Sequence, residues 1–361
     1  MTLVVKIGTS SLTDEAGEID RAAIEKLCTE VAALRVTGQR VVIVSSGAIA
    51  AGLPALGLAR PTDLATLQAI AAVGQSRLMR VYDEVLGDLG LVAGQVLLAP
   101  LDFVHRRQYL HARQTVRRLL EMGVIPIVNE NDAIADEEIR FGDNDRLAAL
   151  VAHLVGARTL VLLTDTPGLY TADPRLDADA SLIEEIVEVD HELERAAGGA
   201  GSARGSGGMA SKLAAAKIAA WSGVRAVIAG AARPGVLAAA LAGEPGVGTV
   251  IRPRDRRLPA RKLWIAFAVG ASGTVVVDDG ARRALTERNT SLLPAGVVKV
   301  IGRFSADDAV EIADLAGEVF AKGLVRHSAG RIAEWAGSRT ADLPADVAHE
   351  VVHRDDLVLL P

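Results

Sequence analysis

Short apolar runs alternate along the chain with longer segments in which apolar residues recur every three or four positions. Runs of about four to eight residues rich in Val, Ile and Leu, bounded by Gly or polar residues, predict strands buried on both faces. Such runs lie at Leu3–Ile7, Val41–Val44, Leu91–Leu98, Val124–Val128, Leu160–Leu163 and Arg225–Ala229. Strands in series with helices predict right-handed crossovers and a parallel sheet covered by helices.

The segment Arg21–Thr37 predicts a helix between the first two strands. Its apolar stripe consists of Ile24, Leu27, Cys28, Val31 and Leu34. Gly38 follows as a candidate end of the helix. Cys28 is expected to be a small buried hydrophobe. Because it is the only cysteine, an intramolecular disulfide framework and a multi-cysteine zinc site are excluded.

The pattern changes near Arg252. Residues 252–262 hold six basic residues, one acid and two prolines, which predicts a linker with a solvated surface, or alternatively a phosphate or RNA contact. Beyond it, short strand-like pieces at Thr274–Val277, Val297–Ile301, Val310–Ile312 and Val319–Phe320 accompany one helical stretch, 280–288. We therefore expect a large α/β domain over 1–255, a linker over 256–270 and a small, mostly β domain over 271–361.

Composition narrows the class of protein. Half of the 361 residues are hydrophobic and only 3% are aromatic, so the core must be aliphatic. The net charge of −6 provides no general attraction for nucleic acid. Neither a signal peptide nor an apolar run of about 18 residues is visible, so we expect a cytoplasmic protein without a membrane span.

Small and basic residues follow the first two predicted strands. Lys6 ends the first strand and precedes Gly8 and three hydroxyl residues, and Ser46 with Gly47 follows the second. In open α/β sheets ligands bind at the carboxyl ends of strands, where a lysine can reach a phosphate. A solvated lysine and a tight turn of small residues are the structural alternatives.

Acidic and amide residues gather in two later loops, Asn129–Asp132 and Gly142–Asp145. Such loops could bind a cation, hold an amino group or orient lysines. The spacing of a calcium-binding EF-hand is absent. Asx turns, and for Asp145 a helix N-cap, are the structural alternatives.

A glycine-rich stretch, residues 198–208, runs directly into a helical pattern that starts near Met209 and carries Lys212 in its first turn. Such a loop can cradle phosphate, although a flexible surface loop is the alternative. Together with Lys6 it supplies two cations, as phosphoryl transfer requires. Thr164 and Asp165, at the end of another strand, are candidates for shaping a nucleotide pocket.

These blocks, in this order, resemble the amino-acid kinase family, in particular its glutamate-phosphorylating branch. The blocks include Leu3–Ser10, Ser46–Gly52, Ala72–Arg77, Asn129–Ala133, Gly142–Asp145, Leu162–Asp165, Gly168–Arg175 and Gly207–Met209. Ser291–Gly296 and Val352–Asp356 resemble the PUA domain that many bacterial members carry. The resemblance implies a three-layer α/β/α sandwich around a mainly parallel sheet, followed by a small PUA-like domain.

The resemblance also implies an activity. ATP, accompanied by Mg²⁺, would phosphorylate the side-chain carboxylate of L-glutamate to L-glutamyl 5-phosphate, the first step of proline biosynthesis. Catalysis would use Lys6, Lys212 and Asp145, and glutamate would bind to Ser46, Asp132 and Asn144. ATP would contact Lys6, Thr164, Asp165, Ser206, Gly207, Gly208, Met209, Ala210, Ser211 and Lys212. Feedback inhibition by proline and a homo-oligomer are further implications; the metal ligands are not implied.

Two alternatives remain open at this point. The first is a kinase of another small acid in the same fold, which the two acid and amide loops disfavour. The second is an RNA-binding protein that acts through the PUA-like domain. Residues 271–361 contain ten Lys and Arg against fourteen Asp and Glu, a charge of 10 − 14 = −4, which makes RNA binding unfavourable.

Overall fold

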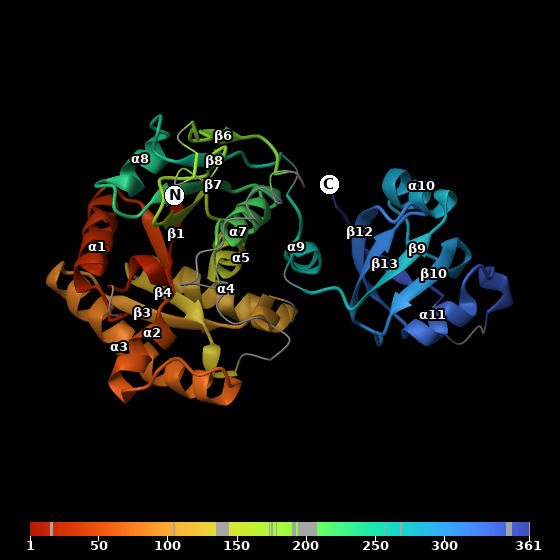
Figure 1. Cartoon of the computed structure of the whole chain (residues 1–361), viewed down its shortest axis with the longest axis horizontal. Helices are drawn as coiled ribbons and strands as arrows, with labels where there is room; N and C mark the ends of the chain where they lie inside the picture. Colours follow the sequence, from red (N-terminus) through yellow and green to blue (C-terminus); the bar gives the residue numbers. More distant parts are fainter. Residues whose placement is uncertain are drawn as a thin grey trace. The chain divides into compact units, whose positions relative to one another are not determined.

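The computed structural model describes residues 1–14, 17–103, 105–134, 144–172, 174, 176–177, 179–189, 193, 208–255, 257–267, 269–343 and 349–360. The chain divides into two compact units, Met1–Arg257 and Leu258–Pro361. Each unit has its own sheet and its own hydrophobic core. Figure 1 colours the first unit from red through yellow to green and the second from teal to blue.

The described part of the first unit holds an eight-stranded sheet with the order β3-β4-β2-β1-β5-β7-β8-β6. Its strands are β1 (Thr2–Ile7), β2 (Arg40–Ser45), β3 (Ala93–Leu98), β4 (Ile125–Glu130), β5 (Thr159–Thr164), β6 (Glu185–Ile186), β7 (Arg225–Gly230) and β8 (Thr249–Ile251). Neighbours from β3 to β7 pair in parallel, whereas β7 and β8 are antiparallel. The prediction of a mainly parallel sheet is confirmed, and every apolar run predicted as a strand forms one.

Helices cover both faces of this sheet. They are α1 (Arg21–Val36), α2 (Ala48–Leu56), α3 (Leu64–Asp88), α4 (Arg106–Glu121), α5 (Asn144–Val155), α7 (Met209–Trp221) and α8 (Val236–Ala242). One layer contains α1, which contacts α3 and α8; the other contains α5, which contacts α4 and α7 (Figure 1). The central strands β4 and β5 are buried along their length. The strand β3 is only partly buried because it lies at the edge of the sheet, so the expectation that this run is buried on both faces is wrong. Within the described residues, no helix combines the length and the hydropathy needed to cross a bilayer.

Helix α1 forms as the pattern predicts. The side chain of Asp20 accepts a hydrogen bond from the backbone N–H of Ala23 at 3.1 Å and so caps the first turn. The apolar stripe faces the core, and Cys28 is fully buried there, as predicted. Gly38 follows the helix with φ of +80°, a conformation that favours glycine, which explains the end of α1.

Helices α2 and α3 pack closely through glycine. A Cβ at Gly52 would collide with the carbonyl oxygen of Ile70, and one at Gly74 would collide with that of Ala48. Gly47 precedes α2 with φ of +99° and gives the chain its sharp turn out of β2. These glycines fix the distance between α3 and the segment that follows β2.

The second unit is mostly β, as predicted. Its described residues form a five-stranded sheet in the order β10-β9-β11-β12-β13. The elements are β9 (Gly273–Val277), α10 (Asp279–Arg288), β10 (Val297–Gly302), β11 (Ala309–Ala313), β12 (Val319–Val325), α11 (Ala329–Trp335) and β13 (Val352–Leu359). The sequence patterns predicted all of these except α11 and β13.

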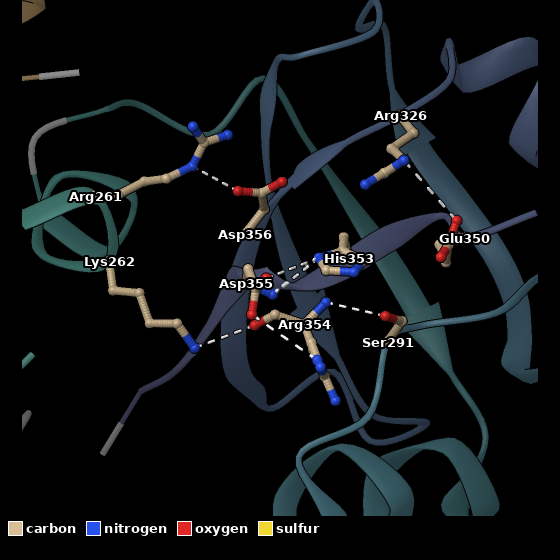
Figure 2. A network of polar contacts seen from close by, with 9 residues as sticks. All are labelled: Arg261, Lys262, Ser291, Arg326, Glu350, His353, Arg354, Asp355 and Asp356. Carbon is tan, nitrogen blue, oxygen red and sulfur yellow. Dashed lines mark hydrogen bonds and ion pairs between the residues drawn. The ribbon is translucent and has the colours of Figure 1, made fainter. Parts of the chain in front are cut away.

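The segment expected to be a linker contains a helix, α9 (Ala260–Phe267), which contacts β12 and β13. Figure 2 shows how it is attached: Arg261 Nε lies 2.6 Å from Asp356 Oδ1, and Lys262 Nζ donates to the carbonyl of Arg354 at 3.1 Å. At the other end of the basic run, Arg252 forms an ion pair with Glu185 at 2.6 Å. These basic residues are therefore partly engaged in contacts inside their own units. The domain boundaries drawn from the sequence remain predictions.

Candidate functional site

Parallel strands of the first unit bring the candidate residues to one edge of the sheet. Lys6 lies near the carboxyl end of β1, Ser46 directly follows β2, and Thr164 ends β5. The end of β4 supplies Asn129 and Glu130. Because these strands are parallel, their carboxyl ends meet on the same side, where open α/β sheets bind ligands.

Two lysines and one aspartate form the centre of the site. Asp145 Oδ1 lies 2.6 Å from Lys6 Nζ, and Asp145 Oδ2 lies 3.3 Å from Lys212 Nζ. The exposed fractions of these residues are 4% for Lys6, 5% for Lys212 and 1% for Asp145. The structure thus brings together residues from β1, α5 and α7 that are up to 206 positions apart, as the separation of Lys6 from Lys212 (212 − 6) shows.

Asp145 reaches this position because α5 begins at Asn144, which places Asp145 inside the first turn. The alternative that Asp145 is an N-cap is therefore wrong: an N-cap precedes the helix, whereas this carboxylate pairs with both ammonium groups. The three side chains carry one excess positive charge among them. A buried cationic pair held in place by one carboxylate suits the charge of a phosphoryl group in transfer.

The residues expected to bind glutamate lie beside this centre. Asn144 precedes Asp145, and its Oδ1 accepts a hydrogen bond from the backbone N–H of Glu130 at 3.3 Å. Asp132 lies in a short 3₁₀ helix, η3 (Asp132–Ile134), that contacts α3. Burial raises the pKa of Asp132 to about 6. Ser46 is buried, and its backbone N–H donates to the carbonyl of Ile7 at 3.2 Å.

The residues expected to bind ATP are described in part. Thr164 Oγ1 donates to Asp165 Oδ1 at 2.9 Å at the end of β5. Gly208 precedes α7, and Met209, Ala210, Ser211 and Lys212 form its first turn. A helix N-terminus presents N–H groups to an anion, so this turn can receive phosphate. Ser206 and Gly207 lie outside the described residues, as do Gly142 and Asp143.

Two polar contacts of α3 were not predicted from the sequence. Asn129 Nδ2 donates to Gln75 Oε1 at 2.8 Å, and the hydroxyls of Tyr82 and Ser45 lie 3.0 Å apart. In the sequence, Gln75 is distinguished only as part of Ala72–Arg77, a block that resembles the family. The available signal is its position, since it is a polar residue on the apolar stripe that α3 presents to the core.

The described residues contain no group of three or more His, Cys, Asp or Glu side chains arranged to hold a metal ion. A divalent cation that arrives with a nucleotide is held largely by phosphate oxygens and water, and one or two carboxylates suffice for it. The arrangement of carboxylates at this edge is compatible with that mode of binding.

Comparisons with known proteins show the family of the chain. Residues 1–230 match the Amino acid kinase family, and residues 273–345 match the PUA domain. Glutamate 5-kinase from Pelobacter propionicus is 45% identical over 99% of this chain and 97% of its own. The enzymes of the same name from Caldanaerobacter subterraneus and a Synechococcus species are 44% and 47% identical, over 100% and 99% of this chain and 98% of their own.

Among solved structures, one described as X-ray structures of isopentenyl phosphate kinase is 23% identical. It covers 70% of this chain and 100% of its own, with a TM-score of 0.50, which supports the fold. The full-length similarity to the three enzymes above goes further than the fold. The chain belongs to the amino acid kinase family, and within it to the glutamate 5-kinases that carry a C-terminal PUA domain.

Proposed function

We propose that the chain transfers the γ-phosphoryl group of ATP to the side-chain carboxylate of L-glutamate. The products are ADP and L-glutamyl 5-phosphate, and the reaction is the first step of proline biosynthesis. The observation that carries this function is the buried contact of Lys6 and Lys212 with Asp145. It supplies two fixed cations at the edge of the sheet where substrates of this fold bind.

The chemistry requires positioning and charge neutralisation rather than a strong base. The side-chain carboxylate of glutamate is already ionised at neutral pH and is itself the nucleophile. Negative charge is spread over the oxygens of the phosphoryl group as it passes between donor and acceptor. Lys6 and Lys212 meet this charge, and Asp145 keeps both ammonium groups in place before substrate arrives.

Glutamate is held by the polar residues beside this centre. The carboxylate of Asp132 binds the ammonium group of glutamate. The pKa of this carboxyl is about 6, so the group is ionised at neutral pH. Asn144 adjoins Asp145 and so brings the amino acid up to the lysines. Ser46 contributes a hydroxyl from the turn between β2 and α2.

ATP occupies the other half of the edge. Thr164 and Asp165 line the nucleotide, and the segment 206–212 surrounds the phosphates with the N-terminus of α7. Mg²⁺ would accompany ATP, held mainly by the nucleotide and water, and would neutralise part of the negative charge on the phosphate groups.

The resemblance supplies the remaining parts of the proposal. Proline shares the α-carboxylate and α-nitrogen of glutamate and inhibits as a competitor. The chain forms a homo-oligomer in the cytoplasm. RNA is not a partner. Residues 271–361 carry ten basic and fourteen acidic side chains, a net charge of 10 − 14 = −4, which repels the phosphate backbone of RNA.

The test is ATP consumption with L-glutamate in the presence of hydroxylamine, with glutamyl hydroxamate as the product measured. N-acetyl-L-glutamate is the control substrate, because acetylation removes the ammonium charge that Asp132 is proposed to bind. We expect hydroxamate from L-glutamate and little from the acetylated acid. Comparable kcat/KM on the two acids would contradict the assignment.

A further inference from the structure

Gln75 is a buried polar residue in the middle of α3. Its exposed fraction is 8%, and it lies on the stripe that includes Ile70, Leu78 and Tyr82. A carboxamide in such a position has two acceptor and two donor sites that must find partners away from water. The partners that it does find determine how the group is oriented.

The orientation of the Gln75 amide follows from a backbone group. The N–H of Glu130 can only donate, so the Asn129 atom that lies 2.9 Å from it is the side-chain oxygen. Asn129 therefore presents its nitrogen to Gln75, at 2.8 Å, and that nitrogen must meet the Gln75 oxygen. Turning either amide around would place two donors against each other. The side-chain nitrogen of Gln75 is consequently the atom left over.

This nitrogen is buried and has no hydrogen-bond partner among the described residues. Leaving a buried N–H group without an acceptor is unfavourable, and native structures rarely keep one without a reason. Since the nitrogen carries two donors and no acceptor, the missing partner is an acceptor. An anionic oxygen forms the strongest bond of this kind.

Gln75 is connected by hydrogen bonds to residues that are proposed to bind glutamate. Through Asn129 it connects to the N–H of Glu130, which also donates to Asn144 at 3.3 Å. The 3₁₀ helix that carries Asp132 contacts α3, the helix of Gln75. The unpartnered donor thus lies in a network that ends at proposed substrate-binding residues.

We propose that Gln75 Nε2 binds the α-carboxylate of L-glutamate, which makes Gln75 a substrate-binding and specificity-determining residue; this rests on the proposed function. The choice between the two carboxylates follows from the order of contacts. Asn144 adjoins Asp145 and the lysines, whereas Gln75 is separated from Asn144 by Asn129 and Glu130. The donor therefore faces the end of glutamate that does not react, which also carries the ammonium group proposed for Asp132.

Two substitutions in the full-length chain test the assignment. Gln75→Glu keeps an oxygen for Asn129 and replaces the donor by an acceptor. Gln75→Met has similar length, cannot donate and accepts only weakly through its sulfur. Gln114→Glu, at an exposed position of α4, is the matched control for the added charge. For each variant, glutamate and ATP are titrated by calorimetry, steady-state kinetics are measured, and thermal unfolding reports the fold.

We expect both Gln75 variants to raise the Kd and KM for glutamate by about tenfold to a hundredfold, which is the loss of one charge-assisted hydrogen bond. The Kd for ATP should stay within about twofold, because Gln75 takes no part in the nucleotide half. Glutamate α-amide adds a second readout: the preference of the wild type for glutamate over this amide should fall in Gln75→Glu, whose carboxylate can accept from the amide.

The outcomes are distinct. Glutamate affinity and preference equal to the wild type in both folded variants would show that the buried nitrogen is satisfied by water, and would overturn the assignment of Gln75 alone. A large fall in kcat at unchanged KM would move the contact to the reacting carboxylate and also overturn it. A wild-type chain that binds glutamate but forms no hydroxamate would overturn the proposed function without touching the binding result.

Discussion

Replacing Lys212 by Met separates the role of the charge from the role of the packed side chain. Met has an unbranched stem of similar length, so it removes the ammonium group with little change in volume. In this variant Asp145 still has Lys6 Nζ at 2.6 Å, so its buried carboxylate keeps a cation. We therefore expect a chain that folds and binds ATP but transfers phosphoryl groups slowly.

The expected magnitude follows from the position of the charge. Losing one preorganised group that meets charge in the transition state typically lowers kcat by about 10²–10³, or roughly 3–4 kcal/mol. ATP keeps its other contacts at the N-terminus of α7, so its Kd should change by less than about tenfold. Lys212→Arg should not restore the rate, because a planar guanidinium does not replace a compact ammonium.

Asp145→Asn should lower the stability of the fold more than Lys212→Met does. It leaves two ammonium groups, of Lys6 and Lys212, buried without the anion that they share. Removing one partner of a buried ion pair costs about 3–5 kcal/mol of stability. For a chain of this size that is a fall in Tm on the order of 10 °C, larger than for Lys212→Met.

Single-turnover chemistry, equilibrium ATP binding and thermal unfolding are measured for each variant. Lys26→Met is the control, because Lys26 forms an ion pair with Glu30 on the partly exposed face of α1 at 2.8 Å and such pairs are worth less than about 1 kcal/mol. Near-wild-type chemistry in Lys212→Met would refute the phosphoryl-transfer geometry. It would leave the glycine-rich segment as an ordinary surface loop.

Four further results are expected. The kcat/KM for glutamate should fall below about pH 6 as Asp132 takes up a proton, and the Asp132→Asn variant should not show this fall. The pKa of Asp132 is raised in the folded chain from 3.8 to about 6, so its carboxyl favours folding at low pH. This contribution to the free energy of unfolding is lost as the pH rises through about 6, which unfolding measured at several pH values would show. Gly74→Ala should lower stability by about 1–3 kcal/mol in denaturant unfolding, since its Cβ would collide with the carbonyl oxygen of Ala48. Proline should raise the apparent KM for glutamate without changing kcat, and unchanged initial rates at millimolar proline would contradict this. A chain of residues 1–257, which hold their own core, should show native circular dichroism and form hydroxamate.

The elements with a strong local pattern could be predicted from the sequence. The buried strands are continuous apolar runs, and α1 has a clear stripe, an acidic cap and a terminal glycine. Helix α9 could not be predicted, because its segment begins in a run of basic residues and prolines that is typical of a linker. The short strands β6 and β8, of two and three residues, have no pattern long enough to detect.

The candidate site divides in the same way. Lys6 and the loop Asn129–Asp132 stand out because they place charged and polar residues at the ends of buried strands. Lys212 stands out because it follows a glycine-rich stretch at the start of a helical pattern. That Asp145 holds both lysines depends on contacts across 139 (145 − 6) and 67 (212 − 145) positions, and no local pattern records such pairs. The contact of Gln75 with Asn129 spans 54 positions, and a single amide on an apolar stripe looks like any other core substitution.

The contacts of α3 support residues near the proposed glutamate site, whereas the contacts among the lysines and Asp145 involve other helices. Tyr82 holds Ser45 at the end of β2, and Gln75 holds Asn129 at the end of β4. Burial raises the pKa of Tyr82, so its hydroxyl stays protonated and keeps this bond throughout the working pH range. The lysines and Asp145, in contrast, depend on β1, α5 and α7. Perturbing α3 should therefore act first on glutamate binding, and perturbing α7, which carries Lys212, should act first on phosphoryl transfer. Helix α5 carries both Asn144 and Asp145, so perturbing it should affect both steps.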